Sequence, residues 1–219
     1  MAVVALVVSI VSAVVAVASM WDSHRSARSA ARSASAAETT AALDQQRRHA
    51  EITPHFRVTC QRGNAEVDRL DLRLFLIGPP ELERLDTLVV VVRDDHPWRN
   101  TATQLAGGPT AEAVAKQIWG PYRFVSGVGP GADPVRGIPG ADLTGRTTPT
   151  GGMPVGEELR FALEPTQPPP WSHQTQRDWQ RELGTKLRLK LECGRIGWEP
   201  WPLTCEIDTV DHSNSVEVP

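Results

Sequence analysis

The densest group of titratable residues in this sequence is Asp94, Asp95 and His96, within the stretch RDDHPWR. They directly follow a run of valines, and the end of a buried strand is a position that can present a divalent cation or a general base. The three residues are therefore weak candidates for the ligands of a metal-dependent enzyme. The favoured alternative is structural, because Asp and His before Pro97 are typical of a turn that ends a strand.

The sequence contains no convincing motif for catalysis or for cofactor binding. The stretch GVGPGA, residues 127–132, has the spacing of a dinucleotide fingerprint, but Pro130 and Pro134 prevent the helix that would have to hold the pyrophosphate. The sequence has no Walker loop, no GxSxG motif and no HExxH motif. We therefore predict no cofactor, and we find no catalytic signature that would make the protein an enzyme.

Three cysteines, Cys60, Cys193 and Cys205, occur without a CxxC pair, and their spacing gives no zinc motif. All three fall on the inward register of predicted strands, where cysteine behaves as a small apolar residue. We predict that they are buried and reduced, as expected in the cytoplasm. The alternative is a disulfide between Cys193 and Cys205 across a terminal hairpin.

Tryptophans gather near the C-terminal end beside prolines, in PPPW and GWEPWP. If they are exposed on loops, such rings can grip a glycan or a proline-rich peptide. If they are buried, they cap the hydrophobic core, which is the interpretation we favour. The candidate partner contacts are Trp171, Trp198 and Trp201.

The charge balance argues against nucleic acid as a partner. The 219 residues carry a net charge of -3, and acidic residues outnumber basic ones after residue 51. A nucleic-acid-binding domain needs a basic face that neutralises phosphates.

The first 21 residues predict a transmembrane helix. Residues 2–21 contain no charge, proline or glycine, and a helix of that length spans roughly 30 Å, the thickness of the hydrocarbon core of a bilayer. No lysine or arginine precedes the apolar run, unlike in a secretory signal. The alternative is a signal peptide cleaved near AVAS, residues 16–19.

Arg25, Arg28 and Arg32 follow the apolar run closely. The positive-inside rule therefore places the C-terminal part of the chain in the cytoplasm. On a helix the three arginines share one stripe that could contact anionic lipid headgroups at the membrane surface. The equally weighted alternative is that they are solvated charges on an alanine-rich helix. The protein is thus predicted to lie in the cell membrane as a single-pass protein.

Residues 22–51 predict a helical juxtamembrane stalk, because they contain no proline or glycine and are rich in helix-forming residues. Alanines recur along this stalk at alternating spacings of three and four, which would let two copies approach closely as a homo-oligomer. The positions are Ala27, Ala30, Ala34, Ala37 and Ala41.

Residues 52–211 predict one antiparallel, Ig-like β-sandwich, which makes the protein mainly β. Apolar and polar residues alternate in residues 56–61, 70–76, 159–164, 187–193 and 203–208, as they do in strands with one buried face. LVVVV, residues 88–92, is apolar on both faces and indicates an interior strand. Residues 174–183 predict a short helix, and the pattern of residues 111–119 does not decide between strand and helix.

Two segments lack any periodic pattern. Residues 127–152 are rich in glycine and proline and predict a long loop. Residues 212–219 predict a flexible tail.

The apolar N-terminal span is followed by SARSAARSASAAETT, RRHAEITPHF, GPPELERLDTLVVVVRDD, WGPYRF and EPTQPPPW. In this order the chain resembles uncharacterised single-pass membrane proteins of GC-rich Gram-positive bacteria. The resemblance covers most of the chain and implies an anchor, a stalk and one globular domain. It implies no activity and no site residues.

Together these features predict a membrane-anchored binding or assembly module that presents its β-sandwich at the cytoplasmic face and recruits a protein partner. The alternative is an extracytoplasmic module that binds glycans or the cell wall through its Trp-rich C-terminal loops. A metal-dependent enzyme at Asp94, Asp95 and His96 is the third possibility.

Overall fold

A computed structural model describes residues 2–62, 69–95, 108–133, 135, 139–209 and 215–219. Within the first 27 residues, it describes the side chains of Met20, Trp21 and Ser26 only. The chain divides into two compact units, Met1–Ala50 and Glu51–Pro219.

The first unit is a helix, α1 (Ala2–Glu51). Arg48 and His49 lie in its last turn, where positive charge interacts favourably with the helix dipole. In the part of the chain that is described, no helix is both long and apolar enough to cross a membrane. The side chains of residues 1–19, for which the sequence predicts the transmembrane helix, lie outside the described residues.

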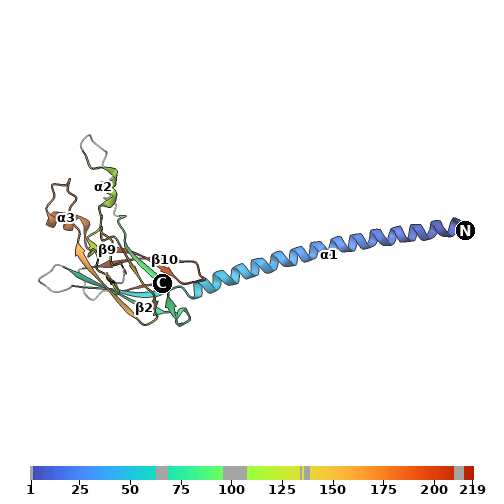
Figure 1. The fold of residues 1–219 in the computed structure, drawn as a ribbon, viewed down its shortest axis with the longest axis horizontal. Helices are drawn as coiled ribbons and strands as arrows, with labels where there is room; N and C mark the ends of the chain where they lie inside the picture. The colour runs from blue at the N-terminus through green and yellow to red at the C-terminus, as the bar shows by residue number, and fades with distance from the viewer. Residues whose placement is uncertain (1, 63–68, 96–107, 134, 136–138, 210–214) are drawn as a thin grey trace. The chain divides into compact units, whose positions relative to one another are not determined.

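The second unit is mainly β, and every strand pair described in it is antiparallel. One sheet has the order β11-β1-β2-β8-β5, a second has the order β10-β9-β4-β6, and β3 and β7 form a small third sheet (Figure 1). The strands are β1 (His55–Arg62), β2 (Leu70–Gly78), β3 (Arg84–Leu85), β4 (Thr87–Val92), β5 (Tyr122–Phe124), β6 (Thr147–Thr150), β7 (Met153–Pro154), β8 (Glu158–Pro165), β9 (Lys186–Gly194), β10 (Trp201–Asp208) and β11 (Ser215–Val218).

Alternate residues of the long strands point into one hydrophobic core that both large sheets share. The buried positions match the apolar registers that the sequence predicts, and within the core the Phe124 and Phe161 rings lie 5.8 Å apart. β4 is an interior strand between β9 and β6, as its unbroken apolar run predicts. The core strand residues include Phe56, Val58, Leu72, Leu74, Leu88, Val90, Phe161, Leu163, Leu187, Leu189 and Leu191.

The undecided segment forms a helix, α2 (Ala111–Lys116), which begins because the Thr110 side chain accepts a hydrogen bond from the backbone N–H of Ala113. A third helix, α3 (Gln176–Leu183), lies within the predicted range 174–183. A 3₁₀ helix spans Pro80–Leu82.

Within the predicted flexible tail, Ser215–Val218 instead form β11 and pair with β1, while residues 212–214 lie outside the described residues. Val218 lies opposite Phe56 and is only 4% exposed, so burial of its side chain fixes this strand. Four residues are too short to show a clear alternating pattern in the sequence.

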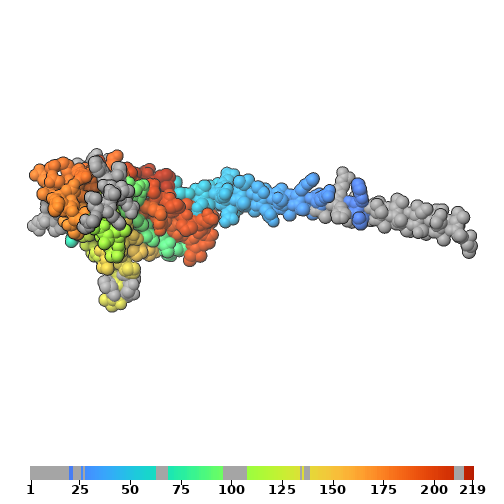
Figure 2. All heavy atoms as spheres, turned by 90° about the horizontal axis from the view of Figure 1, so that it is seen from above, coloured from blue at the N-terminus to red at the C-terminus, as the bar shows by residue number. Residues whose placement is uncertain are grey.

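The predicted long loop is shorter than expected, because β6 occupies Thr147–Thr150. Two backbone hydrogen bonds close its base, from Gly127 N–H to the Ala141 carbonyl and from Ala141 N–H to the Val128 carbonyl. Gly140 permits this closure, because a Cβ there would lie 2.3 Å from the Gly127 oxygen. The described part of the loop projects from the domain (yellow in Figure 2).

All three cysteines are buried and free, as the sequence predicts. A disulfide between Cys193 and Cys205 does not form, because Cys193 lies opposite Trp201 and Cys205 lies opposite Leu189. Burial raises the pKa of each thiol to about 12.

Candidate functional site

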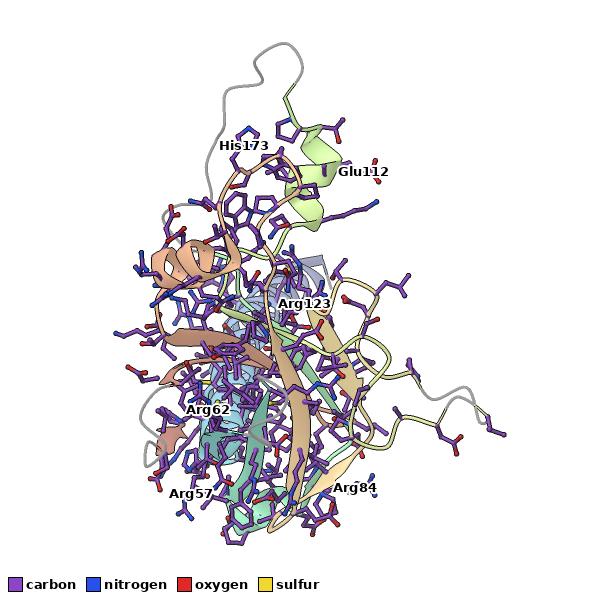
Figure 3. The ribbon with its side chains drawn as sticks, turned by 90° about the vertical axis from the view of Figure 1, so that its left-hand side faces the viewer. Arg57, Arg62, Arg84, Glu112, Arg123 and His173 are labelled. Carbon is purple, nitrogen blue, oxygen red and sulfur yellow. The ribbon has the colours of Figure 1, made fainter. Side chains whose placement is uncertain are left out.

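Two cavities and a network of side-chain hydrogen bonds surround α3. We call α3 and the two segments that hold it, residues 117–121 and 165–167, the α3 platform. Figure 3 places Glu112 of α2 and His173 just before α3 toward one end of the domain, with Arg57 and Arg84 toward the other. The platform includes the end of β8 at Pro165 and the segment just before β5, which begins at Tyr122.

Local sequence explains why α3 forms. Thr175 accepts a hydrogen bond from the Asp178 N–H at 3.2 Å and caps the first turn. Gly184 ends the helix with a φ of 75°, a conformation that glycine adopts without strain. Trp179 and Leu183 lie four residues apart, and both are buried beneath the helix.

Thr166, which is 1% exposed, joins the three parts of the platform to one another. Its hydroxyl donates to the Gly120 carbonyl at 2.5 Å and accepts from Trp179 Nε1 at 3.1 Å. The Trp179 ring also packs against Trp119, with centroids 5.6 Å apart. One threonine therefore satisfies two buried polar groups on separate segments.

Glutamine side chains complete the platform by binding backbone carbonyls. Gln176 and Gln180 both donate to the Thr166 carbonyl, at 2.8 and 2.9 Å. Gln117 donates to the Gln167 carbonyl at 3.0 Å. These bonds fix α3 and the two segments in one arrangement.

A cavity of about 330 Å³, the Trp119 hollow, lies on one side of α3. Its wall includes Trp119, Arg93, Lys186 and Arg188. The Trp119 Nε1 atom is buried and has no hydrogen-bond partner among the described residues. The hollow thus combines an aromatic ring with cationic side chains.

Carboxylates compensate the arginines of the Trp119 hollow. Arg93 binds Asp95, while Arg188 lies 3.7 Å from Asp95 and 3.2 Å from Glu206. Partial burial acts to raise the pKa of the Asp95 carboxyl, but its hydrogen bond and attraction to Arg93 outweigh burial and hold the pKa below its usual value. Positive and negative groups are therefore close to balance here.

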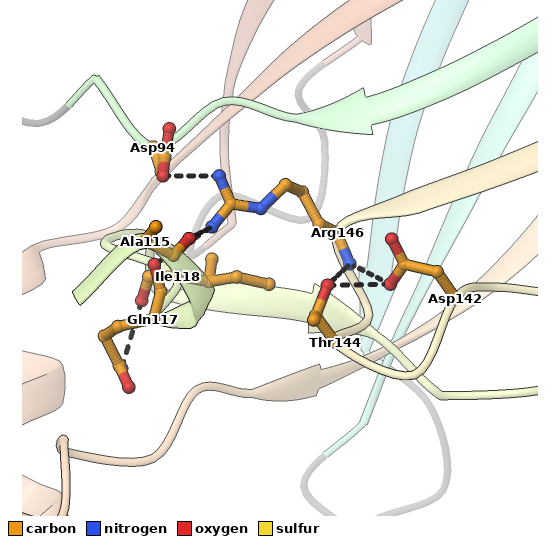
Figure 4. Close-up of polar contacts among 7 residues, drawn as sticks. All are labelled: Asp94, Ala115, Gln117, Ile118, Asp142, Thr144 and Arg146. Atoms are coloured by element: carbon orange, nitrogen blue, oxygen red, sulfur yellow. Dashed lines mark hydrogen bonds and ion pairs between the residues drawn. The ribbon is translucent and has the colours of Figure 1, made fainter. Parts of the chain in front are cut away.

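Arg146 organises the neighbouring chain (Figure 4). Its guanidinium binds Asp94 at 2.6 Å and donates to the carbonyls of Ala115 and Gln117 at 2.9 and 3.0 Å. Its backbone N–H donates to Asp142 at 2.9 Å. Arg146 thus ties the end of α2 to the end of β4, a role that its position in the sequence does not reveal.

The weak metal-site candidates Asp94, Asp95 and His96 receive no support from this geometry, which agrees with the favoured structural interpretation for the two aspartates. The structure directs Asp94 to Arg146 and Asp95 to Arg93 and Arg188, while His96 lies outside the described residues. Within the described ranges, no three His, Cys, Asp or Glu side chains come together as a metal site would require.

A larger, more open cavity of about 700 Å³, the arginine hollow, lies on the other side of α3. Arg69, Arg123 and Arg177 line it together with one carboxylate, Glu164. Arg123 binds Glu164 through two nitrogens, at 2.9 and 2.7 Å. For Arg69 and Arg177 the described part of the chain supplies no ion-pair partner.

Sequence analysis did not find the arginine hollow. More than fifty residues separate each of its arginines from the next along the chain, so no local motif joins them. Only the pairing of β2, β8 and β5 brings the first two arginines to one sheet face, and α3 adds the third.

The predicted partner tryptophans are largely covered. Trp201 is 4% exposed and belongs to the core, and Trp198 packs against that core with its ring 6.5 Å from that of Trp201. Trp171 is half-buried. The structure does not bring these three rings together as an exposed platform.

Of the three arginines predicted to meet lipid, Arg28 and Arg32 have exposed side chains on α1. The side chain of Arg25 lies outside the described residues.

Comparisons with family models, curated proteins and solved structures give no match to this chain. The functional conclusion therefore depends on the α3 platform and its two hollows.

Proposed function

We propose that this protein is a membrane-anchored binding module that recruits a protein partner to the cytoplasmic face of the membrane. The N-terminal helix is the anchor, the second unit is an Ig-like β-sandwich, and the α3 platform is the docking surface. The observation that carries the proposal is the arginine hollow, where three guanidinium groups face one carboxylate.

The anchor rests on the sequence of the first 32 residues. Twenty apolar or small residues are long enough for a bilayer, and three arginines follow on one side only. The buried, free thiols further support a reducing compartment. Self-association through the alanines of α1 is part of this proposal and would display several platforms together.

Binding rather than catalysis is supported by what the polar groups of the platform do. Asp94, Asp95 and Glu164 each bind an arginine, and the glutamines of α3 bind backbone carbonyls. A general base needs a proton to abstract from a bound substrate, whereas these groups hold structure. The arginines left over are suited to contact with a partner.

A crosslinking experiment in cells tests this proposal. A photo-crosslinking amino acid is placed at exposed Gln167, beside the arginine hollow, or at exposed Glu199 on the β9–β10 turn as the matched control. We expect a protein adduct in the membrane fraction from position 167 and none from position 199. Deleting residues 2–21 should release the protein from that fraction.

Two results would contradict the proposal. Equal adducts from both positions would show that the platform is not the docking surface. Activity outside the cell of a phosphatase fused after residue 219 would place the domain on the opposite side of the membrane, as in the glycan-binding alternative.

A further inference from the structure

We infer that the arginine hollow binds an acidic peptide segment, whose aspartate or glutamate side chains lie along an extended stretch of the partner. This inference rests on the proposed function and names the chemistry by which the partner is recognised. It assigns Arg69 and Arg177 as the residues that contact the ligand.

The charge of the arginine hollow indicates a negatively charged ligand. Arg123 is held by Glu164 in a two-nitrogen contact and is thereby fixed in place. Arg69 and Arg177 line the same cavity, but no described carboxylate binds them. Guanidinium groups bind carboxylates with two parallel hydrogen bonds, so a carboxylate-bearing ligand would supply the partner that no described residue gives Arg69 and Arg177.

The size of the arginine hollow indicates an extended ligand and not a single small ion. At about 700 Å³ the cavity is far larger than one small anion needs, and it is open to solvent. Its arginines come from separate places, with Arg69 just before β2, Arg123 on β5 and Arg177 on α3. Charges held by three elements suit several carboxylates along a chain better than one compact ion.

The Trp119 hollow on the other side of α3 provides an internal comparison. Its arginines, Arg93 and Arg188, are bound by Asp95 and Glu206. An anionic ligand there would have to displace existing ion pairs, whereas in the arginine hollow it would add new ones. Because of its excess of positive charge among the described residues, the arginine hollow suits an anionic ligand better than the Trp119 hollow does.

Fluorescence anisotropy with the full-length protein in neutral detergent tests the inference. The probe is a fluorescein-labelled peptide of alternating glycine and glutamate residues, and a peptide of glycine and glutamine serves as the neutral control. We expect the acidic peptide to bind and the neutral peptide to fail. The affinity should fall as salt is raised, since these contacts are exposed to solvent.

The single variants R177Q and R181Q each remove one charge from α3 and therefore separate the hollow from general surface charge. The double variant R69Q/R177Q should weaken binding about tenfold, because it removes two exposed charge contacts. R181Q is the matched control, since Arg181 is also exposed on α3 but binds Asp178 and does not line the hollow. It should leave the affinity unchanged.

Several outcomes would overturn the inference. Equal weakening by R177Q and R181Q, which remove the same charge from the same helix, would reduce the effect to net charge. Competition by millimolar inorganic phosphate at constant ionic strength would indicate a site for a single ion. Binding to phosphatidylglycerol vesicles without binding to the peptide would indicate a lipid surface as the ligand.

The crosslinking experiment distinguishes this inference from the proposed function. If the adduct at Gln167 persists in R69Q/R177Q, the protein recruits a partner but not through acidic residues. If the adduct is absent in the wild type as well, the proposed function itself fails.

Discussion

The hydrophobic core and the α3 platform are held together in different ways. In the core, side chains from both large sheets, such as Phe161 of β8 and Leu191 of β9, pack together, and each contributes through apolar area removed from water. In the platform, the hydroxyl of Thr166 and the amides of Gln176 and Gln180 bind specific partners. The core shares its stability among many residues, whereas the platform depends on a few polar groups.

This difference separates the stability of the domain from the shape of the α3 platform. Apolar packing tolerates exchange for residues of similar volume. A buried hydrogen bond does not, because removing one partner leaves the other unsatisfied. The platform can therefore lose its shape through changes that leave the two sheets folded.

The largest expected effect comes from Phe161→Ala in the core. Phe161 is 2% exposed and packs against Phe124, so its truncation should lower the free energy of unfolding by about 3–5 kcal/mol. Urea denaturation followed by circular dichroism and by tryptophan fluorescence should give one coincident transition. If Phe161→Ala lowered the free energy of unfolding by less than Thr166→Val does, the distinction between the core and the platform would be wrong.

Thr166→Val should cost about 2 kcal/mol, because it leaves the Gly120 carbonyl and Trp179 Nε1 buried without partners. We expect hydrogen exchange to rise in α3 and residues 117–121, while the core strands stay protected. Thr166→Ser is the matched control, since it keeps the hydroxyl, and its exchange should resemble that of the wild type. Uniform acceleration in all strands would contradict a locally held platform.

Alkaline pH should act on the core through its thiols. Burial raises the pKa of Cys193 from 9.0 to about 12, so above pH 9 the thiol ionises in the unfolded chain before it does so in the folded one. The contribution of the Cys193 thiol to the free energy of unfolding is therefore complete below pH 9 and is lost as the pH rises toward 12. Between pH 8 and pH 10, the wild type should lose about 1 kcal/mol more than Cys193→Ala.

Urea denaturation at both pH values measures that difference. The same pH slope in both proteins would show that Cys193 is not buried as described.

The smallest effect is expected for the cap of α3. Thr175→Ala removes the hydrogen bond to the Asp178 N–H and should destabilise the helix by about 0.5–1 kcal/mol. Hydrogen exchange should rise in the first turn of α3 with little change in the urea midpoint. Thr110→Ala, which uncaps α2 instead, should leave α3 unchanged.

The sequence is most informative where the side-chain pattern is regular. The alternation around Phe56, Leu72 and Leu189 predicts buried strand faces because a strand places successive side chains on opposite sides. The same logic predicts the buried cysteines. The helix at α3 was predicted from its polar composition after a proline-rich turn.

The parts that sequence analysis missed depend on contacts between distant residues. β11 is a strand because Val218 is buried opposite Phe56, more than 150 residues earlier. Arg146 and the arginine hollow likewise depend on side chains that only the folded chain brings together. One local signal was available for α3, because Thr175 followed by Asp178 is a helix-capping pattern.

The pairing of β1 has a mechanical consequence. The chain passes from α1 into β1 within four residues, so any tension transmitted along the backbone from the helix enters the domain at this strand. β1 is not an edge strand: it pairs with β2 along its length and with β11 on its other side. A pull on β1 along the strand direction loads many backbone hydrogen bonds in shear at once, which makes the point of attachment resistant to force.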